Sequence, residues 1–349
     1  MSRPVTARGW RPRLGALLLA TTALAALHPA AGAGAPDANP IVTTLILFAG
    51  TPSGLRRSQD WGATWETRDP AKPDGLERVG AVRAIAPLGP LVYLGGEGGF
   101  YFSEDFGRTW EQTVVGPVHC ILLSRYFNIE PTVFVGTRDG LLKSDDAGRT
   151  FRATALRGTP VTRLDWPGPA LIAATGRGVF ISIDSGLSFS GPGQGLPAGD
   201  IGALAVSSYY PVDPVLFAAV GSDGVFRSGD GALTWKPAGL PGHTVMDLAW
   251  LGPFLYATTD RGVYRTEDMG RLWTPLQDGL TGVVPHRLFF PAAPESSAEA
   301  FLATDHGIFR TPDGGQHWLP TGFKGEAVLS LGAFPPPPTL GGKAKKQKS

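Results

Sequence analysis

Short apolar runs alternate with glycine-containing turns along most of this chain. Residues 91–94 (LVYL) and 100–102 (FYF) flank the turn GGEGG, and residues 255–258 (LYAT) and 263–265 (VYR) flank the turn TDRG. Two apolar runs joined at glycine predict a β-hairpin. A further apolar run precedes each hairpin after the first, and we predict that it forms the innermost strand of a repeated unit. These runs are residues 82–87, 118–123, 161–166, 201–206, 245–250 and 284–289.

An eight-residue motif follows every hairpin and recurs seven times. Its first copy, residues 58–65, reads SQDWGATW. Successive copies lie 38 to 46 residues apart, which is the length of one four-stranded propeller blade. No helix is evident, so the repeat predicts an all-β fold, a single seven-bladed β-propeller of four-stranded blades. The shared aspartates are Asp60, Asp105, Asp146, Asp184, Asp230, Asp268 and Asp313.

The residue types in the motif suit a tight turn between two strands. An aspartate early in a turn accepts hydrogen bonds from the turn's own amides. The glycine two residues later tolerates a positive φ, a hydroxyl residue ties the other side of the turn, and the closing Trp or Phe packs beneath it. Calcium is the alternative role for the seven aspartates. Each motif offers one carboxylate, whereas calcium takes about six to eight oxygens, so we predict a structural role and no metal site.

The two ends of the repeat region predict how the ring closes. The first unit begins at residues 44–48 (TLILF) without an innermost strand before it. After the last motif, residues 327–332 (AVLSLG) resemble residues 81–86 (AVRAIA). We therefore predict that the C-terminal strand completes the first blade, which removes the open edges of a linear array of sheets.

The termini differ in composition from the repeats. Four arginines precede an uncharged run at residues 14–27, and the small residues AGA follow at 31–33. This order predicts a signal peptide at 1–33, with an uncleaved anchor as the alternative. We expect a linker at 34–43, the propeller at 44–334 and a disordered tail rich in Pro and Lys at 335–349. The chain is therefore predicted to be secreted or periplasmic, without an integral membrane segment once the signal peptide is removed.

Charge and cysteine content restrict the partners. The whole chain of 349 residues has a formal net charge of +1, but residues 44–334 hold 23 basic and 29 acidic residues. An acidic body argues against nucleic acid as a partner. Cys120 is the single cysteine, so it forms no intramolecular disulfide, and its apolar strand predicts a buried, inert thiol.

The repeated motif resembles the Asp-box, or bacterial neuraminidase repeat. This superfamily includes sialidases, two-domain xyloglucanases, the sortilin luminal propeller and photosystem II assembly or stability factors. The resemblance covers about residues 44–334, and residues 124–131 and 207–214 also look like this group. In architecture the chain is most similar to the photosystem assembly factors, which are single seven-bladed rings of similar length. The motif fixes a turn and not an activity, so the resemblance implies a scaffold.

Charged residues on the innermost strands are the best candidates for a binding site. Ligand sites of propellers usually lie at the channel mouth, opposite the motif turns, beside the turns between the second and third strands of each blade. Charges on these central strands either pair across the channel or line a pocket for an anionic or polar group. The ligand-binding candidates are Arg163, Asp247, Arg287, Arg83 and His119 on the strands, and Arg138, Asp223, Asp260 and Asp305 on the turns.

The sequence contains little that suggests catalysis. Sialidases carry an early Arg-Ile-Pro motif and six blades, and xyloglucanases of this group use two propellers; neither feature is present. Asp223, Asp260 and Asp305 lie in equivalent turns of three successive units, which suggests turn chemistry, and the histidines lack metal-ligand spacing. We predict no catalytic residue, metal or cofactor. The predicted function is an exported, monomeric, non-catalytic scaffold that binds a protein or polysaccharide. The alternative is an extracellular glycoside hydrolase, with residues 66–80 as a lip over the channel.

Overall fold

The computed structural model is all-β over the residues it describes, which belong to one compact unit, residues 42–349. The described residues are 46–60, 62–66, 73–207, 209–210, 212–291 and 298–333. The predicted signal peptide, linker and C-terminal tail lie outside them, as do residues 67–72 of the predicted lip. Among the described residues no helix has the length and apolar character needed to cross a membrane.

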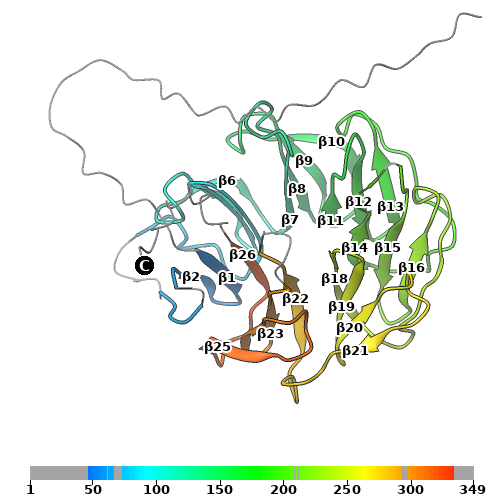
Figure 1. The fold of residues 1–349 in the computed structure, drawn as a ribbon. Coiled ribbons are helices and arrows are strands. Elements are labelled where there is room, and N and C mark those ends of the chain that lie inside the picture. Colours follow the sequence, from blue (N-terminus) through cyan, green and yellow to red (C-terminus); the bar gives the residue numbers. More distant parts are fainter. Residues whose placement is uncertain are drawn as a thin grey trace, which may run out of the picture. The chain divides into compact units, whose positions relative to one another are not determined.

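Seven antiparallel sheets form the blades of a β-propeller (Figure 1). From the innermost strand outward, blade 1 consists of β26 (Ser330–Ala333), β1 (Leu47–Thr51) and β2 (Gly54–Ser58). Blade 2 consists of β3 (Val82–Leu88), β4 (Leu91–Gly96), β5 (Gly99–Ser103) and β6 (Glu111–Val115). Blade 3 consists of β7 (Val118–Leu123), β8 (Val133–Thr137), β9 (Gly140–Ser144) and β10 (Arg152–Arg157). Blade 4 consists of β11 (Val161–Asp165), β12 (Leu171–Thr175) and β13 (Gly178–Ser182).

The remaining three blades repeat this order. Blade 5 consists of β14 (Ile201–Val206), β15 (Leu216–Val220), β16 (Gly224–Ser228) and β17 (Lys236–Pro237). Blade 6 consists of β18 (Val245–Leu251), β19 (Phe254–Thr259), β20 (Gly262–Thr266) and β21 (Thr274–Pro275). Blade 7 consists of β22 (Pro285–Phe289), β23 (Ala300–Thr304), β24 (Gly307–Thr311) and β25 (Leu319–Lys324). In blades 1 and 4 the fourth strand is reduced to one antiparallel bridge, Arg57 with Glu66 and Ile181 with Ser190.

The C-terminal strand closes the ring, as predicted. β26 pairs antiparallel with β1, with Gly50 opposite Ser330 and Leu47 opposite Ala333. The innermost strands contact one another in the order β26, β3, β7, β11, β14, β18 and β22, and β22 contacts β26 again. The first and last parts of the repeat region therefore share one blade, and the inner edge of every sheet faces the channel.

The core lies between the blades. The second strand of each blade is covered on both faces, so it reads as a continuous apolar run and not as an alternating one. Its aromatic side chains, for example Phe48, Tyr93, Phe134, Phe217 and Phe301, are at most 1% exposed. Each such ring contributes about 1.5 to 3 kcal/mol through the apolar surface that it buries.

The aspartate of each repeat turn accepts hydrogen bonds from its own turn, as predicted. In blade 3, Asp146 accepts from the Thr150 amide (2.8 Å), the Thr150 hydroxyl (2.6 Å) and the Ser144 hydroxyl (2.7 Å). The Ser144 hydroxyl in turn accepts from the Gly148 amide at 2.8 Å. These hydrogen bonds, that from the Thr150 hydroxyl foremost, lower the pKa of Asp146 to about 2. The turn therefore keeps its carboxylate ionised.

The repeat turns have a positive φ at two successive residues and not at the glycine alone; in blade 3 these residues are Ala147 (φ 60°) and Gly148 (φ 88°). The turns of blades 5, 6 and 7 differ in sequence from the common motif. In blade 5 an alanine, Ala232, adopts the second of these conformations with φ 68°. In blade 6, Leu272 stands where other copies have a hydroxyl residue. In blade 7 His317 stands there, and its Nδ1 lies 2.6 Å from Asp313 Oδ2.

Candidate ligand-binding site in the channel

A break in strand register aims side chains into the channel. In β11, Val161 pairs with Thr175 but Arg163 pairs with Ala174, so Thr162 is an extra residue without a partner on β12. Such an irregularity puts consecutive side chains on one side of a strand. The same shift occurs at the same place in β3, β7, β14, β18 and β22. Neighbouring residues such as Arg83 and Ala84 therefore both line the channel.

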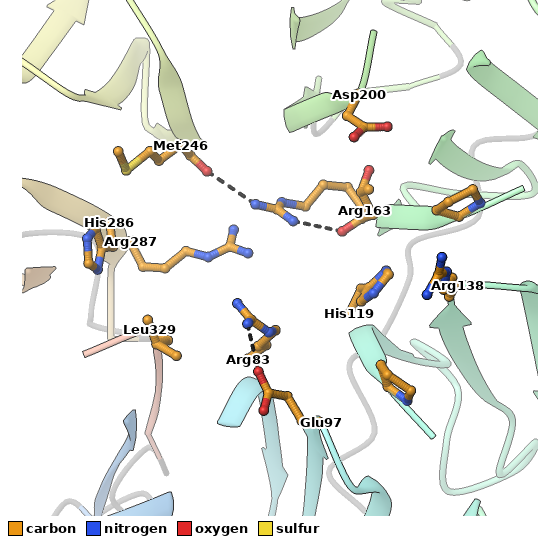
Figure 2. Close-up of a pocket in the computed structure, with 13 residues that line it drawn as sticks. Arg83, Glu97, His119, Arg138, Arg163, Asp200, Met246, His286, Arg287 and Leu329 are labelled. Atoms are coloured by element: carbon orange, nitrogen blue, oxygen red, sulfur yellow. Dashed lines mark hydrogen bonds and ion pairs between the residues drawn. The ribbon is translucent and has the colours of Figure 1, made fainter. Parts of the chain in front are cut away.

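The channel mouth is a cavity of ≈ 860 Å³ to which all seven blades contribute, blades 1 and 5 through Leu329 and Asp200, which directly precede their innermost strands. Figure 2 shows the side chains of Arg83, Arg163 and Arg287 directed into one shared space from β3, β11 and β22. A second cavity of ≈ 260 Å³ shares these arginines and adds Asp247 and Cys120. Burial raises the pKa of the Cys120 thiol to about 12, which agrees with an inert role.

One ion pair joins two blades across the wall of the channel. Arg287 Nη1 lies 2.8 Å from Asp247 Oδ1, and the side chains are 23% and 13% exposed. Asp247 Oδ2 also accepts a hydrogen bond from the Leu288 amide at 3.1 Å. The pair therefore holds β18 against β22, and both oxygens of Asp247 are in use.

Arg163 is partly buried and forms no ion pair with a carboxylate among the described residues. Its guanidinium donates to two backbone oxygens, those of Thr162 (2.7 Å) and Met246 (3.2 Å), and its buried Nε has no hydrogen-bond partner. Burial, assisted by the positive charge of Arg287, lowers the pKa of Arg163 to about 9. A bound anion would supply the missing acceptor and offset both effects.

The outer part of the mouth is more exposed and mixed in charge. Arg83 pairs with Glu97 at 3.0 Å, but both side chains are about half exposed, so this pair contributes little stability. Burial lowers the pKa of His119, and the charges of Arg83 and Arg163 act in the same direction. The imidazole is therefore held in its neutral form more strongly than that of a free histidine.

The structure separates the nine predicted ligand-binding residues into two groups. Those on the innermost strands line the channel, as does Arg138 at the mouth. The three turn aspartates do not line either channel cavity. Asp260 accepts from the Thr244 amide (3.0 Å), Asp305 accepts from the Val284 amide (2.8 Å), and Asp223 is exposed in its turn. Asp260 and Asp305 thus tie turns to the connections between blades.

Asp200 is a channel-mouth residue that the sequence reasoning missed. It lines the larger cavity and immediately precedes β14, in the position that Pro117 and Pro160 occupy before β7 and β11. The strand candidates predicted from the sequence lie within the innermost strands, whereas Asp200 lies directly before one. Among the described residues no group of three or more His, Cys, Asp or Glu side chains has the arrangement of a metal site.

The fold and the channel define a seven-bladed β-propeller with an arginine-lined channel. No family model matches the chain, and no curated protein matches it either. A solved structure of YCF48 bound to D1 peptide has a TM-score of 0.59 and 16% identity, covering 80% of this chain and 98% of that one. An ancestral GH74 enzyme has a TM-score of 0.56 and 18% identity, covering 76% of this chain and 39% of that one. The GH74 xyloglucanase from Xanthomonas campestris has a TM-score of 0.55 and 18% identity, covering 80% of this chain and 58% of that one. The chain therefore spans less than two thirds of each of these GH74 enzymes, and such low identities show the fold alone.

Proposed function

We propose that this protein is an exported, non-catalytic binding propeller whose channel mouth holds an anionic group of a protein partner. The observation that carries the proposal is Arg163, which lies in the channel with a buried, unpartnered Nε and without an ion pair to a described carboxylate. Arg83 and Arg287 enter the same space from other blades (Figure 2). A carboxylate at this point would accept charge-assisted hydrogen bonds from more than one guanidinium.

Two observations favour a protein partner over a polysaccharide substrate. The chain matches the YCF48 structure, which was solved with a bound peptide, over 98% of that chain, but it spans only 39% of the ancestral GH74 enzyme. Hydrolysis of a glycoside also requires two carboxyl groups that face each other across a cleft. The acids that line the mouth among the described residues are Glu97 and Asp200, and Glu97 is paired with Arg83.

The test compares an arginine inside the channel with one outside it. Arrays of acidic peptides and acidic glycans are probed with the purified chain and with Arg163→Met, which keeps the length of the side chain but removes its charge. Arg177→Met is the matched control, because Arg177 is exposed in a turn of blade 4. We expect Arg163→Met to weaken peptide binding more than tenfold, since one hydrogen bond to a charged group contributes about 1.5 to 3 kcal/mol.

Two results would reject the proposal. Equal binding by the wild type and Arg163→Met would show that the channel arginines do not hold the ligand. Release of product from a glycan, abolished by Asp200→Asn, would instead make the protein a glycoside hydrolase.

A further inference from the structure

Blade 3 shows how this fold accommodates two cations side by side on its outer strands. Lys143 on β9 lies directly opposite Arg152 on β10. Like charges in this arrangement destabilise a sheet. Asp145 forms ion pairs with both cations: its Oδ1 lies 3.1 Å from Lys143 Nζ, and its Oδ2 accepts a hydrogen bond from Arg152 Nη1.

Blade 5 has the same two cations but lacks the acid. Arg227 on β16 lies directly opposite Lys236 on β17. Arg227 and Lys143 both stand three residues before the aspartate of their repeat turns. The residue equivalent to Asp145 is Gly229, which has no side chain. The charge that neutralises blade 3 is therefore missing from blade 5.

In blade 5 the Arg227 guanidinium lies next to the position at which a side chain of residue 229 would begin. Its buried Nε has no hydrogen-bond partner. A Cβ atom added to Gly229 would lie 3.6 Å from Arg227 Nη2 and 3.7 Å from Nη1. The guanidinium thus lies directly over Gly229, at the contact distance of a side chain that the sequence does not provide.

Every other described cation at this position of a blade has a partner within the chain. Arg57 pairs with Glu66 at 3.1 Å, and Arg310 pairs with Glu299. The Arg265 guanidinium stacks on the Phe254 ring, 4.4 Å from its centroid. Arg227 is therefore the exception among these equivalent cations.

A cavity of ≈ 930 Å³ opens at this point, between the repeat turns of blades 5 and 6. Its cations are Arg227, Lys236 and Arg271, the last from the turn of blade 6. Its two carboxylates belong to the repeat turns: both oxygens of Asp230 accept hydrogen bonds within the turn. Asp268 accepts from Thr266 and two amides on Oδ1. None of the three cations forms an ion pair with a carboxylate among the described residues, so they face an open space without a bound counter-charge.

We propose that this rim cavity is a binding site for an external oxyanion, a carboxylate, sulfate or phosphate group, which takes the place that Asp145 occupies in blade 3. Arg227 offers a planar set of donors and Lys236 a point charge, as Arg152 and Lys143 do for Asp145. The site lies at the end of the strands opposite the channel mouth, beside the repeat turns, so it is separate from the ligand site of the channel.

The test is to supply the missing acid within the chain. The melting temperature of the full protein is measured during titrations with sodium sulfate, phosphate and acetate, at an ionic strength held constant with chloride. Gly229→Asp recreates the blade 3 arrangement, and Gly229→Ala is the matched uncharged control. Gly229 does not have a positive φ and is exposed, so the turn can accept either alanine or aspartate without backbone strain.

We expect at least one of the three anions to raise the melting temperature of the wild type saturably. Gly229→Asp should weaken that response at least tenfold, Gly229→Ala should retain it, and Lys236→Ala should weaken it without altering the turn. Arg163→Met should also retain it, which separates this site from the channel. No response to any anion, or an unchanged response in Gly229→Asp, overturns the proposal.

Discussion

The repeat turns and the channel satisfy their charges in opposite ways. In a repeat turn the aspartate is bonded entirely within its own motif, as Asp146 is to Ser144 and Thr150. In the channel the ion pair joins Asp247 and Arg287 of different blades, 40 residues apart in sequence. The turns are complete as soon as a blade forms, whereas the channel is complete only when the ring closes.

This difference separates scaffold from binding site within one repeated unit. Where the repeat is kept, as at Asp146, the carboxylate has its hydrogen-bond partners within its own turn. Where the repeat is broken, a cation lacks its partner, as at Arg163 in the channel and at Arg227 beside Gly229. Departures from the repeat are therefore the places at which recognition is to be sought in this fold.

Removal of Asp247 should be the most damaging change to either region. In Asp247→Ala, Arg287 is left in the channel wall without its counter-charge, and we expect a loss of about 2 to 3 kcal/mol of unfolding free energy, less than for a fully buried pair because water reaches the channel. Urea denaturation measures it. The double variant Asp247→Ala, Arg287→Met should recover most of the loss. A single variant as stable as the wild type would contradict a structural role for the pair.

Removal of one turn aspartate should have a smaller effect. Asp146→Ala leaves the Thr150 amide without its acceptor, and we expect a loss of about 1 to 2 kcal/mol, as for removal of a helix-capping side chain. Glu104→Ala is the matched control, because this carboxylate makes an ion pair with Arg149 in which both side chains are about half exposed, and its loss should cost about 0.5 kcal/mol or less. Equal losses in urea denaturation would show that the turn hydrogen bonds contribute nothing special.

The turn of blade 7 should make stability depend on pH in a direction opposite to that of the other turns. The hydrogen bond and charge of Asp313 raise the pKa of His317, while the pKa of Asp313 is lowered to about 2. The stabilisation is complete below the unfolded histidine pKa of about 6.5 and is lost as pH rises through the folded pKa. Asp278, 3.6 Å from His317 Nε2, acts in the same direction.

His317→Thr tests this dependence, because threonine is the residue of most other copies and does not titrate in this range. The urea midpoint of the wild type, relative to that of the variant, should be higher at pH 5.5 than at pH 8.5. A difference between the two proteins that does not change with pH would show that the imidazole is not charged by Asp313.

The repeat predicts the scaffold from local patterns, and the structure confirms it. These patterns are the spacing of the aspartates, the glycines of the hairpins, and the likeness of residues 327–332 to 81–86. Each can be recognised in the sequence without knowing which strands come into contact, and β26 does close blade 1. The fourth strands of blades 1 and 4 were predicted in full, but each is a single bridge, Arg57 with Glu66 and Ile181 with Ser190. These outermost strands have one neighbour, so few contacts specify their length.

The site was harder to predict because it depends on contacts between distant strands. The charged positions of the innermost strands were found, and their shared direction results from a register shift that no single strand reveals. The pairing of Asp247 with Arg287 depends on how the neighbouring strands β18 and β22 lie against each other, and the absence of an ion pair for Arg163 depends on the positions of side chains from several blades.

The smallest expected effect comes from restoring the repeat where it is incomplete. Leu272 in blade 6 is 70% exposed and stands where other copies donate a hydroxyl to the second aspartate oxygen. Leu272→Thr should add that hydrogen bond to Asp268 and raise the melting temperature by roughly 1 °C. Leu233→Thr is the control, because Leu233 is equally exposed (68%) but does not occupy the donating position. If both variants change the melting temperature equally, removal of an exposed leucine is the cause; a rise in Leu272→Thr alone assigns it to the turn.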